Sequence, residues 1–326
     1  MRIGRAAGVT DTGRRRLRNE DAFICEPPLF AVADGMGGAR AGEVAARLAA
    51  AALEEAGAET RGEQGITALI VEANRRIWDR ALADPATAGM GTTVTAALVD
   101  ESHGTVAIGH VGDSRAYLLR NGVLEQLTTD HSLVAELVES GVLTPEEAER
   151  HPQRSAITRA LGTEPTVQVE VLTIAGEPAD LFLLCSDGLP TMLGDEEIAA
   201  ALDGAERDPA AAAEALVAAA NEQGGEDNIT VVLFELAEGE APTEEPTPAE
   251  LQPVEYSPVE NRPVENRPVE NEPVEDESEM EAPATEASKT SLSRHGAGPG
   301  GRGVALAFIA AAVVIAAVAL YLGITK

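Results

Sequence analysis

The composition of the chain changes abruptly near Ala237, and this change limits any globular fold to the residues before it. The run PVEYSPVENRPVENRPVENEPVEDE that follows repeats proline every five residues, starting at Pro253. Proline at this spacing forbids a regular helix, and the repeated glutamates repel one another. Because each repeat is too short to bury a core, residues 238–303 are predicted to be a disordered, acidic linker. A binding epitope is the alternative interpretation of the repeats.

A second constraint lies near the C-terminus, where residues 304–322 carry no charge over 19 positions. As a helix rising 1.5 Å per residue, this run would span about 28 Å, close to the hydrocarbon thickness of a bilayer. We therefore predict a transmembrane helix that contacts the lipid bilayer, with residues 323–326 as a short extracytoplasmic tail. Three basic residues precede the span closely and one follows it. The positive-inside tendency then predicts a single-pass protein of the cell membrane with its N-terminal domain in the cytoplasm.

Charge is distributed unevenly between the regions. Residues 1–237 hold 39 acidic and 18 basic residues, and residues 238–288 hold 16 and 2, within a total net charge of −31. This balance speaks against nucleic acid as a partner, because no basic patch could outweigh it. The acidic residues of a domain usually form a solvated surface, although carboxylates can also converge on a site that divalent cations neutralise.

The two cysteines, Cys25 and Cys185, are too few for a disulfide framework, and Cys185 lies in an apolar run that predicts burial.

Residues 1–237 alternate strand-like and helix-like patterns, which predicts an α+β domain of layered sheets covered by helices. Apolar or β-branched runs bounded by Gly, Asp or Asn predict strands at 29–34, 92–99, 105–111, 116–120, 181–186 and 229–236. Apolar residues three and four positions apart predict helices at 41–55, 66–83, 133–140 and 209–221. The letters GDSR between the third and fourth strands are typical of a tight turn, so an antiparallel hairpin is predicted there.

Acidic residues recur where these strands meet turns. They are Glu20, Asp21, Asp34, Asp130, Asp187 and Asp227. Each one alone is explained by the preference of Asp and Asn for strand ends and turns. If the strands are neighbours, however, the carboxylates gather at one end of a sheet, which is tolerable only when cations are present. Oxygen ligands without clustered His or Cys suit Mg²⁺ or Mn²⁺ rather than zinc.

Eight segments carry a resemblance to a known family, and it covers residues 4 to about 236. In chain order they are RRRLRNEDAF, FAVADGMGG, GTTVTAALV, HVGDSRAYLLR, LTTDHSLV, ITRALG, LLCSDGL and GGEDNITVVL. On these segments the chain resembles bacterial members of the metal-dependent protein serine/threonine phosphatases, the type 2C family. The resemblance implies two antiparallel β-sheets packed as a sandwich and flanked by helices in α/β/β/α layers. It also implies hydrolysis of phosphoserine and phosphothreonine in proteins, in opposition to serine/threonine kinases.

The resemblance further implies a site with two Mn²⁺ or Mg²⁺ ions. Asp34 would bridge the two ions, and Gly35 would offer its backbone carbonyl to one of them. Asp187 and Asp227 would complete the coordination of the other ion. A water bridging the ions would become hydroxide near neutral pH and attack phosphorus in line. The glycines after Asp34 would let the backbone pass close to the ions.

Four further residues receive roles by the same resemblance. Glu20 and Asp21 would hold metal-bound waters, and Asp130 would help to bind a third, weaker metal. Arg16, four residues before Glu20, would clamp the substrate phosphate. Three other arginines lie within two positions of Arg16, so the sequence alone leaves this assignment open.

The chain departs from many eukaryotic members at Met36, where they carry a histidine that is a candidate general acid. Methionine cannot donate a proton, so that role stays unassigned, with a metal-bound water as the alternative. By the resemblance, the segment between Asp130 and Ile157 is a flap beside the site, and its letters LTPEEAERH predict a short helix beginning near Pro145.

The alternative function is a weak pseudophosphatase that binds phosphoproteins as a membrane-tethered module. A third hypothesis is that the chain is a structural tether whose acidic tail recruits partners.

Overall fold

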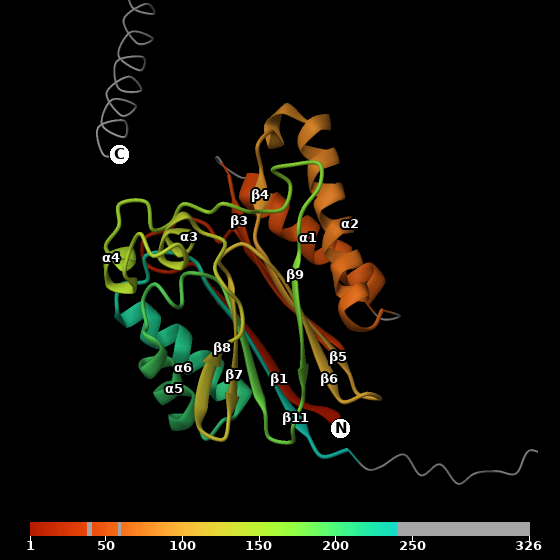
Figure 1. Ribbon diagram of the computed structural model, residues 1–326, viewed down its shortest axis with the longest axis vertical. Helices are drawn as coiled ribbons and strands as arrows, with labels where there is room; N and C mark the ends of the chain where they lie inside the picture. Colours follow the sequence, from red (N-terminus) through yellow and green to blue (C-terminus); the bar gives the residue numbers. More distant parts are fainter. Residues whose placement is uncertain (38–40, 58–59, 240–326) are drawn as a thin grey trace, which may run out of the picture. The chain divides into compact units, whose positions relative to one another are not determined.

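Two antiparallel sheets form the centre of the described part of the chain (Figure 1). The computed structural model describes residues 1–37, 41–57 and 60–239. The first sheet has the strand order β1 (Arg2–Asp11), β11 (Ile229–Ala237), β10 (Leu181–Cys185), β7 (Arg115–Arg120) and β8 (Val123–Gln126). The second has the order β2 (Asp21–Glu26), β3 (Leu29–Met36), β5 (Val94–Asp100), β6 (Thr105–Val111) and β9 (Glu170–Ala175), and β4 (Gly91–Thr92) pairs with β3.

The two sheets pack against each other through aromatic and branched side chains. Phe234 of β11 stacks on Phe30 of β3 with ring centroids 4.1 Å apart, and on Phe182 of β10 at 4.9 Å. All three rings are fully buried. Each remaining sheet face is covered by a pair of helices, so the layers run helix, sheet, sheet, helix. This arrangement confirms the predicted sandwich of antiparallel sheets flanked by helices.

The helices belong to three groups. The helices α1 (Ala41–Gly57) and α2 (Gly62–Ala83) cover the second sheet, and α5 (Asp195–Gly204) and α6 (Pro209–Glu222) cover the first (Figure 1). The short helices α3 (Leu133–Glu139) and α4 (Pro145–Glu149) lie in the predicted flap segment, and the 3₁₀ turn Pro85–Thr87 follows α2. The helix α4 begins as predicted, with Pro145 in its first turn and a capping box between Thr144 and Glu147.

The predicted hairpin across GDSR is wrong. β6 pairs with β5 and β9 in the second sheet, whereas β7 pairs with β10 and β8 in the first. The letters GDSR therefore mark a crossing from one sheet to the other. Both strands bury nearly every residue, which two separate sheets in a sandwich allow and a half-exposed hairpin would not.

The predicted linker, membrane helix and tail lie outside the described residues, apart from positions 238 and 239. Within the described ranges, no helix combines the length and the apolar character that a membrane crossing requires. Cys185 is fully buried in the core beneath α5 and α6, as the sequence predicted.

Candidate active site

Asp34 lies inside β3 and not at its end, because the strand continues through Met36. Asp21 of β2 stands directly opposite Asp34 in the antiparallel register. The backbone of Asp34 is fixed on its other side: its N–H donates to Thr93 Oγ1 at 3.0 Å, and its carbonyl accepts from Thr93 N and Thr92 Oγ1 at 2.9 and 2.8 Å. The two sheet neighbours therefore hold the Asp34 main chain rigidly while its carboxylate turns toward the site.

Gly35 stands where three backbone segments meet. A Cβ at this position would lie 2.2 Å from the carbonyl oxygen of Gly42 and 2.5 Å from that of Glu20. Gly42 is equally crowded, since a Cβ there would lie 2.3 Å from Glu20 Oε2. Only glycine fits at either position, and the result is that the Glu20 carboxylate is held against the first turn of α1, close to Asp34.

Asp187 and Asp227 reach the same place from the other sheet. Asp187 follows β10 and Asp227 precedes β11, and these two strands are paired. Burial, with the charges of Asp21 and Asp187 added, raises the pKa of Asp34 well above its usual range. Burial, with the charge of Asp227 added, raises the pKa of Asp187 to about 6.

Arg16 is the arginine whose guanidinium faces this cluster. Its Nη2 donates to Asp227 Oδ2 at 2.5 Å. Burial alone would lower the pKa of Arg16, but the charge and hydrogen bond of Asp227, with the charges of Asp34 and Asp187, raise it. The structure thus distinguishes Arg16 from the neighbouring arginines that the sequence could not separate from it.

Asp21 is half-buried, and its Oδ1 is inaccessible to solvent. Thr230 Oγ1 donates to its Oδ2 at 2.6 Å, whereas its Oδ1 has no hydrogen-bond partner among the described residues. Burial raises the pKa of Asp21 to about 7, although hydrogen bonds from Thr230 and Ser186 oppose the shift. Glu20, one residue earlier, donates its N–H to Asn228 Oδ1 at 2.8 Å.

Sequence reasoning missed Asp113, which lies at the crossing from β6 to β7. It is 8% exposed, and its Oδ1 has no partner within the described ranges. Burial first, and then the charges of Asp187 and Asp130, raise its pKa to about 7. The GDSR letters were interpreted as a hairpin turn, so its aspartate was not considered. The signal was nevertheless present, because Asp113 follows the apolar strand β6 just as Asp187 follows β10.

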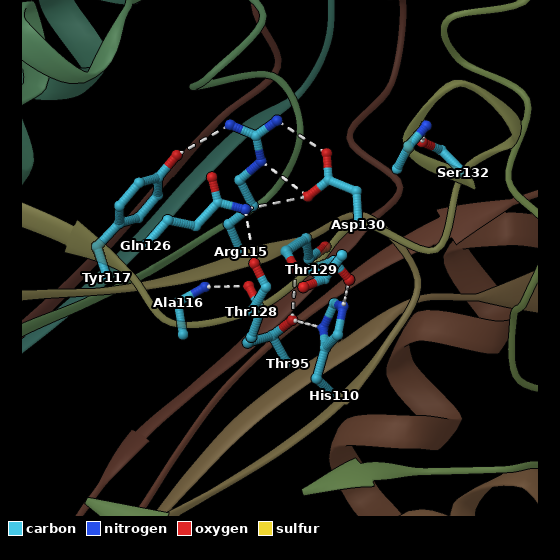
Figure 2. A network of polar contacts seen from close by, with 12 residues as sticks. Thr95, His110, Arg115, Ala116, Tyr117, Gln126, Thr128, Thr129, Asp130 and Ser132 are labelled. Carbon is cyan, nitrogen blue, oxygen red and sulfur yellow. Dashed lines mark hydrogen bonds and ion pairs between the residues drawn. The ribbon is translucent and has the colours of Figure 1, made fainter. Parts of the chain in front are cut away.

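Asp130, the predicted ligand of a third metal, is paired with a cation. Figure 2 shows Arg115 donating from Nε and Nη2 to the two carboxylate oxygens of Asp130, at 2.9 and 2.8 Å. Tyr117 accepts from the same guanidinium at 3.1 Å, and Gln126 lies 3.4 Å from Asp130 Oδ1. The arginine neutralises Asp130 in place, so Asp113 rather than Asp130 presents the unpartnered carboxylate oxygen beside Asp187.

These observations test whether divalent cations fit the cluster. Asp21, Asp113 and Asp187 each bury one carboxylate oxygen that has no partner in the described residues. Desolvation and mutual repulsion raise their pKa values, which is the condition that a bound dication relieves. Oxygen is also the donor that Mg²⁺ and Mn²⁺ prefer. The donor set therefore fits hard divalent cations.

The side chains do not stand in a ready-made coordination geometry. In the part of the chain that the structure describes, no group of three or more His, Cys, Asp or Glu side chains is arranged to hold a metal. One candidate ligand, Asp227, is instead bound to Arg16. Cation binding at Asp227 would have to replace this contact.

A cavity of about 800 Å³ adjoins the cluster. Asp113 and Asp187 line its inner end, and Val138 of α3, Pro145 of α4 and Arg154 line the flap side. The flap segment thus borders a space that opens onto the acidic residues. This position agrees with the expectation that the flap lies beside the site.

Comparisons with known proteins agree with this geometry. The family model described as protein phosphatase 2C matches residues 13–227. The serine/threonine phosphatase stp of Listeria monocytogenes is 42% identical over 238 residues, which are 69% of this chain and 93% of that protein. The crystal structure of the Mycobacterium tuberculosis serine/threonine phosphatase PstP/Ppp is 40% identical, with a TM-score of 0.69, covering 72% of this chain and 100% of that one. A PstP catalytic domain in complex with two manganese ions is 38% identical, with a TM-score of 0.66 over 72% of this chain and 99% of that one.

Proposed function

The chain belongs to the protein phosphatase 2C family of bacterial serine/threonine phosphatases, and on this premise we propose that it hydrolyses phosphoserine and phosphothreonine in proteins at the cluster around Asp34. One observation carries the assignment of the site. Carboxylates from both sheets converge there and face the guanidinium of Arg16. Phosphoryl transfer needs mainly positioning and neutralised charge, which such a site supplies once cations are bound.

We assign the cations to two positions and take them to be Mn²⁺ or Mg²⁺. Asp34 would bridge them, the Gly35 carbonyl would join one, and Asp187 and Asp227 would hold the other. The similar phosphatase domain that contains two manganese ions supports a dinuclear site. When bound, the ions supply an activated water as the nucleophile and neutralise the phosphate charge.

Hydrogen bonding and charge indicate which residues would hold metal-bound waters and which would hold a third cation. Glu20 and Asp21 would hold waters in the coordination shell, because Asp21 keeps one oxygen without a partner among the described residues. A third, weaker cation would use Asp113 and not Asp130, since Arg115 already neutralises Asp130.

The protein residues have two tasks of their own. Arg16 would exchange its contact with Asp227 for the phosphate oxygens of the substrate, so its guanidinium would bind and orient the ester. Protons that the raised pKa values keep on Asp34 and Asp187 would leave when cations bind, because only the ionised carboxylates are good ligands. Met36 is 36% exposed at the end of β3 and cannot protonate the leaving serine oxygen.

Location and partners are part of the proposal. We infer that residues 1–237 form the catalytic domain, that residues 238–303 link it to a membrane helix at 304–322, and that the domain is cytoplasmic. The substrates would include phosphorylated serine/threonine kinases. The uncharged run before Leu322 and the acidic proline repeats support this organisation.

The test is hydrolysis of a phosphoserine peptide and of p-nitrophenyl phosphate by the full chain in detergent, with and without Mn²⁺. We expect metal-dependent release of phosphate that a chelator abolishes and added Mn²⁺ restores. Peptide binding without phosphate release, at any metal concentration, would instead identify a phosphoprotein-binding module and overturn the proposal.

A further inference from the structure

Residues 14–18, the arginine segment, have the sequence RRRLR and are exposed along their whole length. Arg16 turns inward to Asp227. Within the described ranges, the guanidiniums of Arg14, Arg15 and Arg18 make no ion pair and no hydrogen bond. Leu17 between them is 99% exposed, so the segment buries none of these side chains.

Unpaired arginines are unusual in this domain, where carboxylates outnumber basic residues. Most other arginines among the described residues are paired with Asp or Glu. These are Arg5, Arg47, Arg75, Arg76, Arg80, Arg115, Arg120 and Arg207. Three neighbouring guanidiniums repel one another, and without an acidic partner they add nothing to the stability of the fold. A cluster of this kind is better suited to an external anion.

The backbone of the arginine segment is fixed even though its side chains are free. The N–H groups of Arg14 and Arg15 both donate to the Gly225 carbonyl, at 2.7 and 3.2 Å. The Asn228 side chain donates to the carbonyls of Thr12 and Arg18, at 3.0 and 2.8 Å. Both ends of the segment are therefore attached to the loop that carries Asp227. A binding group on a fixed backbone loses less conformational freedom when it captures a ligand.

We propose that Arg14, Arg15 and Arg18 recognise a second anionic group on the substrate, close to the phosphorylated residue held at Arg16. This inference rests on the proposed function. The guanidinium fork binds carboxylate and phosphate oxygens in pairs, so the second group is either an acidic side chain or another phosphoryl group. An extended peptide advances roughly 3.3 Å per residue, and the free arginines are within two positions of Arg16. The second anion would therefore lie on the order of one to three residues from the phosphoserine.

The test compares three phosphoserine peptides that differ only at two flanking positions, carrying glutamates, a second phosphoserine or glutamines. The full chain with Mn²⁺ is assayed at low and at high salt. We expect kcat/KM to favour at least one anionic peptide by roughly tenfold at low salt, mainly through KM, and high salt to weaken this preference. The peptide that is preferred identifies the source of the anion.

Two kinds of variant decide whether the arginine segment is responsible. Arg14→Gln combined with Arg15→Gln should reduce the preference to less than about threefold, by loss of charge-assisted hydrogen bonds. Leu17→Ala, in the same segment, and Arg75→Gln, on the surface of α2, should both keep it. Loss of the preference in the Arg75 control as well would overturn the assignment.

The outcomes also separate this inference from the proposed function. Turnover of the glutamine peptide without any preference for the anionic peptides overturns the inference alone. No turnover of any peptide overturns the proposed function and this inference with it. A preference that the Arg14 and Arg15 substitutions leave intact places anion recognition elsewhere and also overturns the inference.

Discussion

The two ends of strand β10 carry aspartates in opposite situations. Asp180, just before the strand, is 1% exposed and accepts from Arg120 Nε and Nη2 at 2.8 and 2.6 Å. It also accepts the N–H of Glu177 at 2.8 Å. Asp187, two residues beyond the other end, faces carboxylates, and its Oδ1 has no partner in the described residues. Strand β10 thus has an aspartate with an ion-pair partner at one end and an aspartate that faces other carboxylates at the other. We call the Asp180 end the compensated end and the Asp187 end the uncompensated end.

This difference separates stability from function. A buried carboxylate with an arginine and an amide partner is satisfied by the protein itself, so that end of the sandwich is complete. The opposite end gathers Asp21, Asp34, Asp113 and Asp187, whose pKa values are raised chiefly by burial. Such an arrangement reduces stability unless cations bind, and raised pKa values of this kind mark functional sites.

The largest expected effect is at the uncompensated end. Asp187→Asn or Asp34→Asn should lower kcat by at least roughly 10²-fold, the scale of losing a key electrostatic group. The same substitution should leave the metal-free protein at least as stable as the wild type, because it removes a repelled carboxylate. Steady-state kinetics and chemical denaturation in chelator measure the two quantities. Near wild-type turnover of Asp187→Asn would show that the site assignment is wrong.

The matched change at the compensated end should do the reverse. Asp180→Asn leaves Arg120 with the Glu177 carboxylate and the Ala175 carbonyl as partners, and breaking a buried ion pair is expected to lower the free energy of unfolding by about 3 kcal/mol. At a temperature where the variant is folded, its kcat with Mn²⁺ should stay within about threefold of wild type. A variant that lost activity without losing stability would contradict the division between the two ends.

The third prediction concerns pH and cations at the Asp187 end. The folded-state pKa values of Asp187 and Asp21 are raised to about 6 and about 7. Their contribution to stability is therefore fully present below about pH 4 and is lost as the pH rises through 6 to 7. In chelator we expect the unfolding free energy to fall by about 4 kcal/mol between pH 5 and pH 8, at about 1.4 kcal/mol per pKa unit. Saturating Mn²⁺ should remove this fall, because it binds the ionised carboxylates.

Asp187→Asn serves as the control for this measurement. It should make the fall in chelator smaller, with the part due to Asp21 remaining, whereas Asp180→Asn should keep the slope of the wild type between pH 5 and pH 8. Urea midpoints recorded across this range would decide the question. A metal-free wild type that gained stability with rising pH would contradict the raised pKa values.

The strands that the sequence predicted are the interior ones. The runs at 29–34, 105–111 and 181–186 correspond to β3, β6 and β10, which have strand neighbours on both sides. Buried neighbours make such strands continuously apolar, which is the signal that a sequence shows. The strands β1, β2, β8 and β9 were missed, and they are the edges of the two sheets. Their residues are mostly exposed or half-buried, so burial does not impose on them the continuous apolar character of the interior strands.

The candidate site, like the set of strands, was predicted only in part from the sequence. Asp34, Asp187 and Asp227 were found because each adjoins an interior strand, and the structure brings all three together. Asp113 was missed because nothing local shows that β6 and β7 belong to different sheets. The pairing of Asp130 with Arg115, 15 residues away, was not foreseen because it depends on tertiary packing. Pairing between strands and ion pairs at a distance are properties of the fold, which a single sequence does not display.

The smallest expected effect concerns the part of the chain after β11. This strand ends at Ala237, at the compensated end: the N–H of Leu236 donates to the Asp180 carbonyl, and the N–H of Ala179 donates to that of Leu236. The chain therefore leaves the domain at the end of the sandwich away from Asp187. Removing residues 240–326 should leave kcat/KM on a soluble phosphopeptide within about twofold. We also expect the shortened protein to move from the membrane to the soluble fraction, because the predicted span is absent. The comparison is full-length protein in detergent against residues 1–239 on one peptide, with Asp187→Asn in both lengths as the inactive control. A tenfold loss of activity on shortening would show that the tail contributes to the site, and the separation between the two ends would fail.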